Sequence, residues 1–253
     1  MRISTYNIWD NERGMPARFN QVIEEIKNNN ADILCVQELP DYEAFNTISE
    51  LCRYDEGYWN EQYGVGIYTK FDVISIAKSD YGIAAVVDIY GARLLVINVH
   101  LPWKSAFKRE ELIVDMIESS RNIECDYTII AGDYNCSENS SVHRYLKGDQ
   151  SLRGSDAYFV DLAETFAEIE GESPAATLNV RNNPRYRDEK GNSTNTIEIN
   201  QRYDRILLKN PFPKAYPRLT SCGIFGTKIS PVTKLCASDH YVVFADLEFE
   251  IDV

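Results

Sequence analysis

Short apolar runs, separated by amphipathic or polar stretches, are the feature that most constrains how this chain folds. Runs of about four to eight residues rich in Val, Ile, Thr and Tyr are typical of strands. We predict strands at residues 2–8, 32–36, 65–68, 73–77, 84–89, 94–99, 127–131, 205–208 and 242–249. These strands must pair into sheets, because an unpaired strand leaves a row of backbone N–H and C=O groups without partners.

Helical periodicity lies between several of these strands. Apolar residues recur at helical spacing after Pro16, and proline suits the first turn of a helix because its missing N–H would be unpaired there anyway. The asparagines at 28–30 are expected to end this helix. Further helices are predicted at about residues 40–52, 112–117 and 161–169. Residues 137–200 otherwise look polar and loop-like, and the basic, Asn-rich stretch 181–195 is expected to be a surface loop.

The connections between strands indicate the architecture. Strands outnumber helices, and consecutive strands are joined both by helices and by hairpins. This pattern predicts an α/β (α+β) fold in which mixed sheets carry helices on their outer faces. The 253 residues can bury a sizeable core, and we expect a single domain over residues 1–253.

The net charge limits the kind of partner that the chain can hold. Lys and Arg number 26 against 39 Asp and Glu, which gives a net charge of −13. Binding of long nucleic acid over a broad basic face is therefore disfavoured, because phosphate neutralisation requires many cations. A short or end-on contact with a nucleic acid, assisted by bound metal, remains open. No feature of the sequence points to a partner protein.

The cysteines and the N-terminus indicate the compartment. The six cysteines form no CxxC pair and no zinc-like spacing, and Cys35 lies in an apolar run that predicts a buried thiol. The N-terminus shows no cationic and apolar leader, and no apolar stretch approaches the length of a membrane span. We therefore expect a cytoplasmic protein with reduced cysteines and no membrane span.

Polar residues stand at the ends of the predicted strands. In sheet proteins such positions and the adjoining loops concentrate binding and catalytic groups, because the rigid sheet holds them in place. The residues concerned are Asn7, Glu38, His100, Asp133, Asn135, Asp204, Asp239 and His240.

Part of this set suits a hard divalent cation. Mg²⁺ is usually held by one or two carboxylates together with waters and substrate oxygens. Glu38, Asp239 and the amide oxygen of Asn7 can supply such ligands. We therefore predict a site for Mg²⁺, with Mn²⁺ as an alternative ion.

The remaining residues suit hydrolysis of a phosphate ester. Asp133 can accept a proton from the attacking water while Asn135 orients it. His240, held as an imidazolium by Asp204, can stabilise the negative charge that builds up on the phosphoryl oxygens, and so can His100. We predict that these five residues are catalytic.

Each residue alone has a simpler interpretation. Glu38 could be a surface carboxylate, Asn7 a turn former and His100 a packed histidine. Trp103 and Tyr203 are expected to be packing groups, and His143 a solvated side chain on a polar loop. The simpler interpretations lose weight when all the strand-end residues occur in one chain.

Six short motifs, taken in order, resemble the endonuclease/exonuclease/phosphatase superfamily. They are TYNIW (5–9), VQE (36–38), NVHL (98–101), GDYN (132–135), RYDRILL (202–208) and SDH (238–240). The resemblance implies a four-layer sandwich in which two packed mixed β-sheets are flanked by helices. It also implies that Glu38, Asn7 and Asp239 bind metal. Asp133 with Asn135, His240 with Asp204, and His100 then carry the chemistry.

Within the superfamily the nearest likeness is to the tyrosyl-DNA phosphodiesterase 2 group, through residues 161–166, 177–183 and the end of the chain. Two departures fall in the part that binds substrate. Leu178-Asn179 stand where the group carries a Trp-Asp pair. Its Ser and Arg phosphate contacts have no match in residues 102–105, where Lys104 is the candidate replacement.

The resemblance therefore implies a metal-dependent phosphodiesterase that cuts a phosphate ester by in-line attack of water. A DNA end is one candidate substrate. Another nuclease activity and a phosphoinositide-type phosphatase are the alternatives within the superfamily. A non-catalytic binding module on the same fold is the alternative of a different class.

Overall fold

The computed structural model describes residues 1–188, 190–194 and 197–249, and it contains two six-stranded sheets. Sheet A consists, in spatial order, of β11 (Arg218–Phe225), β12 (Val242–Glu248), β1 (Arg2–Asn7), β2 (Ile33–Gln37), β4 (Val65–Thr69) and β3 (Glu56–Asn60). Sheet B consists of β5 (Val73–Ser79), β6 (Gly82–Ile89), β7 (Ala92–His100), β8 (Tyr127–Asp133), β10 (Asp204–Lys209) and β9 (Phe159–Asp161). Both sheets are mixed, as the sequence predicted.

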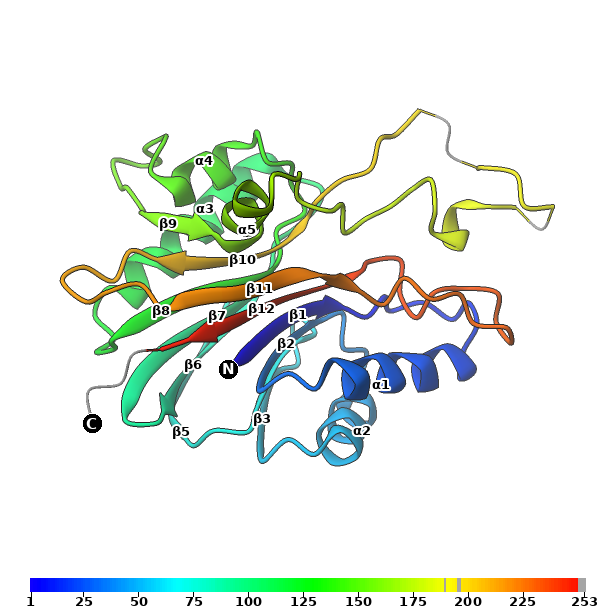
Figure 1. The fold of residues 1–253 in the computed structure, drawn as a ribbon, viewed down its shortest axis with the longest axis horizontal. Coiled ribbons are helices and arrows are strands. Elements are labelled where there is room, and N and C mark those ends of the chain that lie inside the picture. Colours follow the sequence, from blue (N-terminus) through cyan, green and yellow to red (C-terminus); the bar gives the residue numbers. More distant parts are fainter. Residues whose placement is uncertain (189, 195–196, 250–253) are drawn as a thin grey trace.

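Helices cover the outer faces of the two sheets (Figure 1). They are α1 (Ala17–Asn29), α2 (Tyr42–Cys52), α3 (Ala106–Ser120), α4 (Ser141–Lys147) and α5 (Leu162–Glu170). Helices α1 and α2 pack on sheet A, whereas α3 and α4 pack on sheet B. Helix α5 packs against β10 and β11. The four-layer sandwich implied by the sequence motifs is confirmed.

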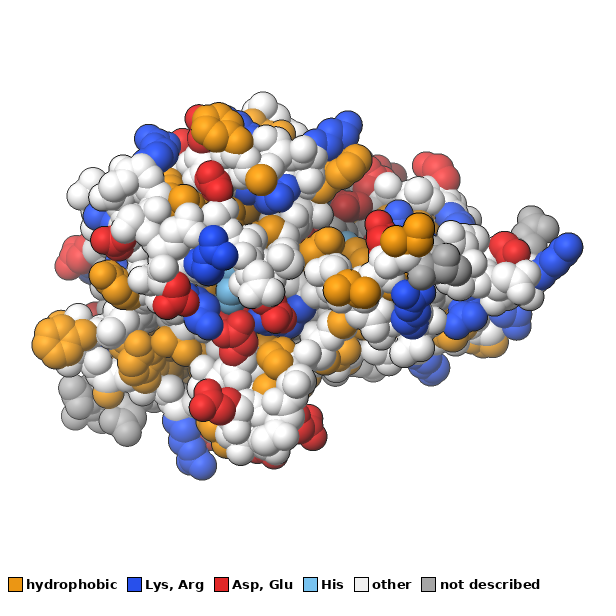
Figure 2. All heavy atoms as spheres, turned by 90° about the horizontal axis from the view of Figure 1, so that it is seen from above, with side chains coloured by type: hydrophobic (Ala, Val, Ile, Leu, Met, Phe, Trp, Pro, Cys, Tyr) orange, Lys and Arg blue, Asp and Glu red, His pale blue; other side chains and the backbone are white. Residues whose placement is uncertain are grey.

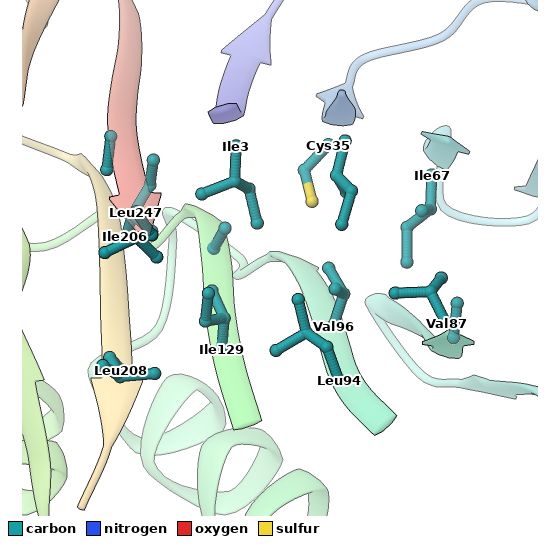
Figure 3. Close-up of a cluster of buried hydrophobic side chains, with 14 of the residues drawn as sticks. Ile3, Cys35, Ile67, Val87, Leu94, Val96, Ile129, Ile206, Leu208 and Leu247 are labelled. Atoms are coloured by element: carbon teal, nitrogen blue, oxygen red, sulfur yellow. The ribbon is translucent and has the colours of Figure 1, made fainter. Parts of the chain in front are cut away.

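The central core lies between the sheets, where apolar side chains from both interdigitate (Figure 3). Strand β2 is continuously apolar in sequence because both of its faces are buried. Ile33 and Cys35 face sheet B, while Leu34 and Val36 face the helices α1 and α2. A strand buried on both faces cannot alternate with polar residues. Burial of each such side chain stabilises the fold by about 1.5–3 kcal/mol.

Helix ends follow the local chemistry of the chain. Helix α1 begins after Pro16 and ends at Asn30, whose left-handed φ of 51° is a conformation that Asn tolerates. The side chains of Asp41, Ser105 and Asp161 accept hydrogen bonds from the free N–H groups in the first turns of α2, α3 and α5. The predicted start and end of the first helix are confirmed.

Four elements were missed by sequence reasoning, among them three strands at sheet edges. Strands β3, β9 and β11 each have one neighbour only, and β3 and β11 are half-exposed, so they lack a clear apolar pattern. The fourth is α4, which lies inside a stretch predicted to be loop. Ser140 caps it, and Gly148 ends it at a φ of 84°. Helix α4 is short, which leaves little periodicity to detect.

The stretch 181–195, predicted to be a surface loop, belongs to a long segment that projects from the sandwich (Figure 1). It contains a 3₁₀ turn at Pro184–Tyr186 and an isolated bridge between Arg187 and Ser193. Residues 189 and 195 of the predicted loop lie outside the described residues. Among the described residues, no helix is long and apolar enough to cross a bilayer. All six cysteines are free, and Cys35 is fully buried as predicted.

Candidate active site

The topology brings the predicted site residues to one edge of the sandwich. Strands β1 and β2 run parallel, and so do β7 and β8, with His100 opposite Asp133. Strand β10 pairs antiparallel with β8 so that its first residue, Asp204, lies opposite Asp133. Strand ends that carry the motif residues therefore meet, although they lie far apart in the sequence.

These residues surround a cavity of about 910 Å³. The predicted residues that line it are Glu38, His100, Asp133, Asn135, Asp239 and His240. The other two lie directly behind the cavity wall. Asn7 bonds to Glu38 and Asp133, and Asp204 bonds to His240. Glu38 and His240 therefore share one cavity.

Glu38 sits at a sharp change in chain direction after β2. Its φ of 61° lies in the left-handed region, which non-glycine residues seldom adopt. Oε1 accepts a hydrogen bond from Asn7 Nδ2 at 2.9 Å, and Oε2 accepts one from the backbone N–H of Asp10 at 2.8 Å. The side chain remains 29% exposed, so both oxygens are oriented and still face the cavity.

Asn7 links two carboxylates. Its amide nitrogen donates to Glu38 Oε1 at 2.9 Å and to Asp133 Oδ2 at 3.0 Å, while its amide oxygen accepts from the N–H of Trp9 at 3.0 Å. An inverted amide would set its oxygen against both carboxylates and its NH₂ against an N–H. In this structure Asn7 therefore acts as a bridge, and its role as an oxygen ligand stays a prediction.

Asp133 ends β8 beneath the cavity and is 1% exposed. Its Oδ1 accepts from the backbone N–H of Asn135 at 2.8 Å. Asn135 in turn donates from Nδ2 to the carbonyl of Leu101 at 2.9 Å, which ties the end of β7 to the GDYN turn. Gly132 allows this close approach, because a Cβ there would overlap the carbonyl oxygen of Val99.

His240 and Asp204 form a buried pair. Nδ1 of His240 lies 2.8 Å from Asp204 Oδ2, and Nε2 lies 4.0 Å from Asp133 Oδ2. Burial lowers the pKa of His240, but the charges of Asp204 and Asp133 outweigh burial and raise it to about 10. Burial raises the pKa of Asp204 as well. We place the shared proton on His240, because Asp133 adds a second negative charge beside the imidazolium.

His100 lies between two carboxylates at the end of β7. Its Nε2 is 3.7 Å from Asp133 Oδ2 and 3.9 Å from Glu38 Oε1. The side chain is 21% exposed and faces the cavity. Two imidazoles and five carboxylates therefore line one cavity, a set that combines hard anionic ligands with donors for a phosphoryl oxygen.

The family model for the endonuclease/exonuclease/phosphatase family matches residues 4–240. The chain belongs to the endonuclease/exonuclease/phosphatase family. No curated protein matches the sequence significantly.

Solved structures of similar fold include members of the group that the motifs resemble. A D. rerio TDP2 complexed with a single-strand DNA product aligns with a TM-score of 0.77 at 16% identity, covering 98% of this chain and 99% of that one. A truncated Caenorhabditis elegans TDP2 gives 0.71 at 19% identity, with 98% and 97% coverage. The human Nocturnin catalytic domain with bound sulfate gives 0.68 at 17% identity, with 99% and 94% coverage. At these identities the likeness establishes the fold.

The sequence analysis did not predict Arg185. This residue lies on the projecting segment and lines the main cavity. Its guanidinium is ion-paired with Asp239, a predicted metal ligand. Nearby, Asn183 is buried and donates from Nδ2 to the carbonyl of Ser238 at 2.9 Å, which docks the segment beside the SDH motif. The Asn-rich composition of this stretch concealed both residues, because Asn and Arg are usual in exposed loops.

Two interpretations of single residues were wrong. His143 is not solvated: it is 3% exposed on α4, and its Nε2 lies 3.0 Å from Glu164 Oε1. Trp103 is not a packing group, because it is 70% exposed and lines the rim of the cavity. Tyr203 also lines the cavity and is partly buried. The missed helix α4 explains the error for His143.

Two clusters among the described residues have ligand atoms close enough to share a cation. One comprises Asp133, Asp204 and His240, and the other comprises His143, Asp161 and Glu164. In the first, Asp204 is fully buried behind His240 and lines no part of the cavity. In the second, the guanidinium of Arg202 lies 2.7 Å from Asp161 and 3.0 Å from Glu164, so a cationic group already fills the cluster.

Proposed function

We propose that this chain is a Mg²⁺- or Mn²⁺-dependent phosphodiesterase that acts on the end of a nucleic acid strand. The observation that carries this proposal is the single cavity lined by Glu38, Asp133, Asp239, His100 and His240. It combines hard oxygen ligands with a histidine that stays protonated at neutral pH. A cytoplasmic location stays a prediction.

The donors at the cavity fit a hard divalent cation. Glu38 and Asp239 offer carboxylate oxygens, with Asn7 behind them, and no thiol lines the cavity among the described residues. Mg²⁺ keeps several waters, so it requires an open site such as the cavity beside Glu38 rather than the buried Asp204. When bound, such a cation would neutralise phosphoryl charge and polarise the ester for attack.

Side chains of this protein would supply the proton acceptor and the groups that contact the phosphoryl oxygens. Asp133, oriented by Asn7 and by the N–H of Asn135, would accept the proton of the attacking water. His240, kept charged by Asp204, would donate to a phosphoryl oxygen as negative charge accumulates. His100, between two carboxylates at the cavity wall, would contact another oxygen of the same phosphate.

A second cavity supports a nucleic acid substrate. It measures about 650 Å³ and shares His100 and Trp103 with the first. No carboxylate lines it among the described residues, but Lys104 and Lys108 do, and the rings of Tyr63 and Tyr81 lie 4.5 Å apart at its wall. Lysines suit phosphates, and the exposed ring of Trp103 suits a stacked base.

Two further features support strand binding. Arg109 donates to the carbonyl oxygens of Pro102 and Trp103, both at 2.9 Å, and so holds the loop that presents the indole. Lys and Arg side chains also gather on the projecting segment, at the right in Figure 2, although the chain as a whole is acidic. The charge is therefore unevenly distributed, with cations on the projecting segment and beside the second cavity.

The first test is turnover of bis-p-nitrophenyl phosphate with Mg²⁺ or Mn²⁺. We expect activity that EDTA abolishes and that Glu38→Ala lowers by at least about a hundredfold. Glu43→Ala, a change of an exposed carboxylate in α2, is the matched control and should retain activity. Turnover that survives both EDTA and Glu38→Ala would exclude the proposed metal site. Absence of turnover on any phosphoester would favour a binding module.

A substrate panel then separates the alternatives. It contains a 5′-phosphotyrosyl oligonucleotide, plain single-stranded and duplex DNA, and a soluble phosphoinositide. We expect the best kcat/KM on a substrate with a nucleic acid end, and a loss of that preference in Trp103→Ala with Lys104→Ala. A preference for the phosphoinositide would replace the nucleic acid proposal and keep the chemistry.

A further inference from the structure

Asp239 carries a charge that is almost fully removed from water. The residue is 4% exposed, and the guanidinium of Arg185 is its ion-pair partner. A buried carboxylate without a counter-charge is costly, so this pairing stabilises the rim of the cavity. Asp239 is also a proposed metal ligand. The guanidinium of Arg185 and a divalent cation would therefore bind the same carboxylate.

Arg185 is the one Lys or Arg among the described residues that line the main cavity. The carboxylates that line the same cavity are Asp10, Glu38, Asp133, Glu198 and Asp239. A phosphodiester anion is repelled by such a wall unless positive groups offset the charge. Arg185 is therefore well placed to receive the substrate as well as to neutralise Asp239.

The backbone of Arg185 is anchored, whereas its head group lies on aromatic faces. Its N–H donates to Asn183 Oδ1 at 3.0 Å, and its carbonyl accepts from Arg13 Nη1 at 3.0 Å. The guanidinium carbon lies 5.0 Å from the ring centre of Trp9 and 5.2 Å from that of Tyr186. The flat guanidinium can slide over these faces while the main chain stays fixed.

We propose that Arg185 is a substrate-binding residue whose guanidinium changes partner, from the carboxylate of Asp239 to the phosphate of the substrate. In the structure it neutralises Asp239; once a divalent cation holds that carboxylate, the guanidinium turns to the phosphoryl oxygens. This inference rests on the proposed function. Arginine suits the exchange because its fork binds carboxylate and phosphate in the same two-pronged geometry.

In this exchange the metal and Arg185 compete for binding to Asp239. Both of them bind the phosphate together. Removal of the guanidinium should therefore affect the two ligands in opposite directions. A purely structural arginine that pins the projecting segment would instead weaken both, because its loss would disorder the rim.

The test measures binding without turnover. The Mn²⁺ dissociation constant is measured by electron paramagnetic resonance. The affinity for thymidine 5′-monophosphate at saturating Mg²⁺ is measured by calorimetry. We expect Arg185→Ala to bind Mn²⁺ several-fold more tightly and the nucleotide at least about tenfold more weakly. Arg185→Lys should show a smaller loss for the nucleotide. Arg187→Ala, on the same segment but outside the cavity, should leave both values within about twofold.

Opposite shifts in Arg185→Ala support the exchange. Unchanged or weaker Mn²⁺ binding, or unchanged nucleotide binding, would overturn it. If Arg185→Ala does not fold, Arg185→Gln gives the same two measurements with a side chain of similar length. Neither measurement needs catalysis, so absence of turnover in the wild type would count against the proposed function and leave this inference to be decided separately.

Discussion

At the scale of single residues, charge placement decides what the site can do. Asp204 and His240 share a proton inside the wall, while Glu38 and Asp239 face the cavity. Carboxylates thus have two roles, which their position relative to the cavity separates. Asp204, behind the wall, sets a protonation state, whereas Glu38 and Asp239 line the cavity and can hold a cation.

The Asp204–His240 pair leads to the first prediction. Asp204→Asn keeps the shape of the side chain but removes the charge that holds the proton on His240. We expect kcat on bis-p-nitrophenyl phosphate at pH 7 to fall by about a hundredfold or more, with little change in Mn²⁺ affinity. The exposed Asp149→Asn is the control. Activity within a few-fold of wild type would show that this charge has no catalytic role.

A second buried cluster gives a prediction for pH. The hydrogen bond from His143, together with Lys147 and Arg202, outweighs burial and lowers the pKa of Glu164 to about 2 from an ordinary 4.5. A depressed carboxyl pKa contributes stability that is fully present above pH 4.5 and is lost as the pH falls towards 2. We expect Glu164→Gln to be less stable than wild type at pH 7, and the difference to shrink below pH 4.5.

Urea unfolding at pH 7, 4.5 and 3 measures this difference. Glu168→Gln, an exposed position on the same helix, is the control and should show no such trend. A constant difference between wild type and Glu164→Gln over this range would contradict the lowered pKa.

The sequence predicted which residues meet at the cavity better than it predicted their contacts, and the roles of these residues stay a prediction. Asn7, Glu38, Asp133 and His240 could be chosen because each follows or precedes a recognisable strand. Arg185 could not, because it lies in a short 3₁₀ turn rather than at a strand end, and its partner Asp239 is 54 residues away in the sequence. His143 was misjudged because a seven-residue helix carries too little periodicity to reveal which face is buried.

At the scale of elements, the parallel pairing of β7 with β8 positions Asp133. Gly132 has a φ of 144°, and a Cβ at this position would lie 2.8 Å from the backbone nitrogen of Val99 in addition to overlapping its carbonyl. The neighbour is backbone within a sheet, which cannot move aside locally. The glycine of the GDYN motif is thus a requirement of close strand approach.

The corresponding prediction is that Gly132→Ala destabilises the fold by about 2–4 kcal/mol, through overpacking and backbone strain together. Gly154→Ala is the matched control, because its φ is also positive at 72° but nothing lies within 4 Å of the added Cβ. We expect Gly154→Ala to lower the free energy of unfolding by about 1 kcal/mol or less. Denaturant unfolding measures both, and equal losses would show that the clash contributes nothing.

The internal strands were predicted closely. Of the four edge strands, β5 was predicted and β3, β9 and β11 were missed. Strands β1, β2, β7 and β8 bury one or both faces against a second layer, so their apolar character is forced. The edges β3 and β11 are half-exposed, and their sequences are correspondingly mixed. The position of a strand in its sheet sets how much of it is buried, and so how clear its apolar pattern is in the sequence.

At the scale of the whole molecule, the two sheets share one core and meet in one site. Strands β1 and β2 of sheet A and β7, β8 and β10 of sheet B all contribute to the same edge. This arrangement supports a single domain over residues 1–253, which stays a prediction. It also makes the site depend on the packing of the sandwich, since neither sheet alone carries a complete set of groups.

The most direct test of the proposed metal-dependent hydrolase is the position of bound metal. Crystals soaked with Mn²⁺ and thymidine 5′-monophosphate would locate the ion by its anomalous scattering. We expect the strongest peak in the cavity beside Glu38, with the phosphate between the ion and His240. A peak confined to the cluster of His143, Asp161 and Glu164, or no peak within reach of Glu38, would contradict the proposed site.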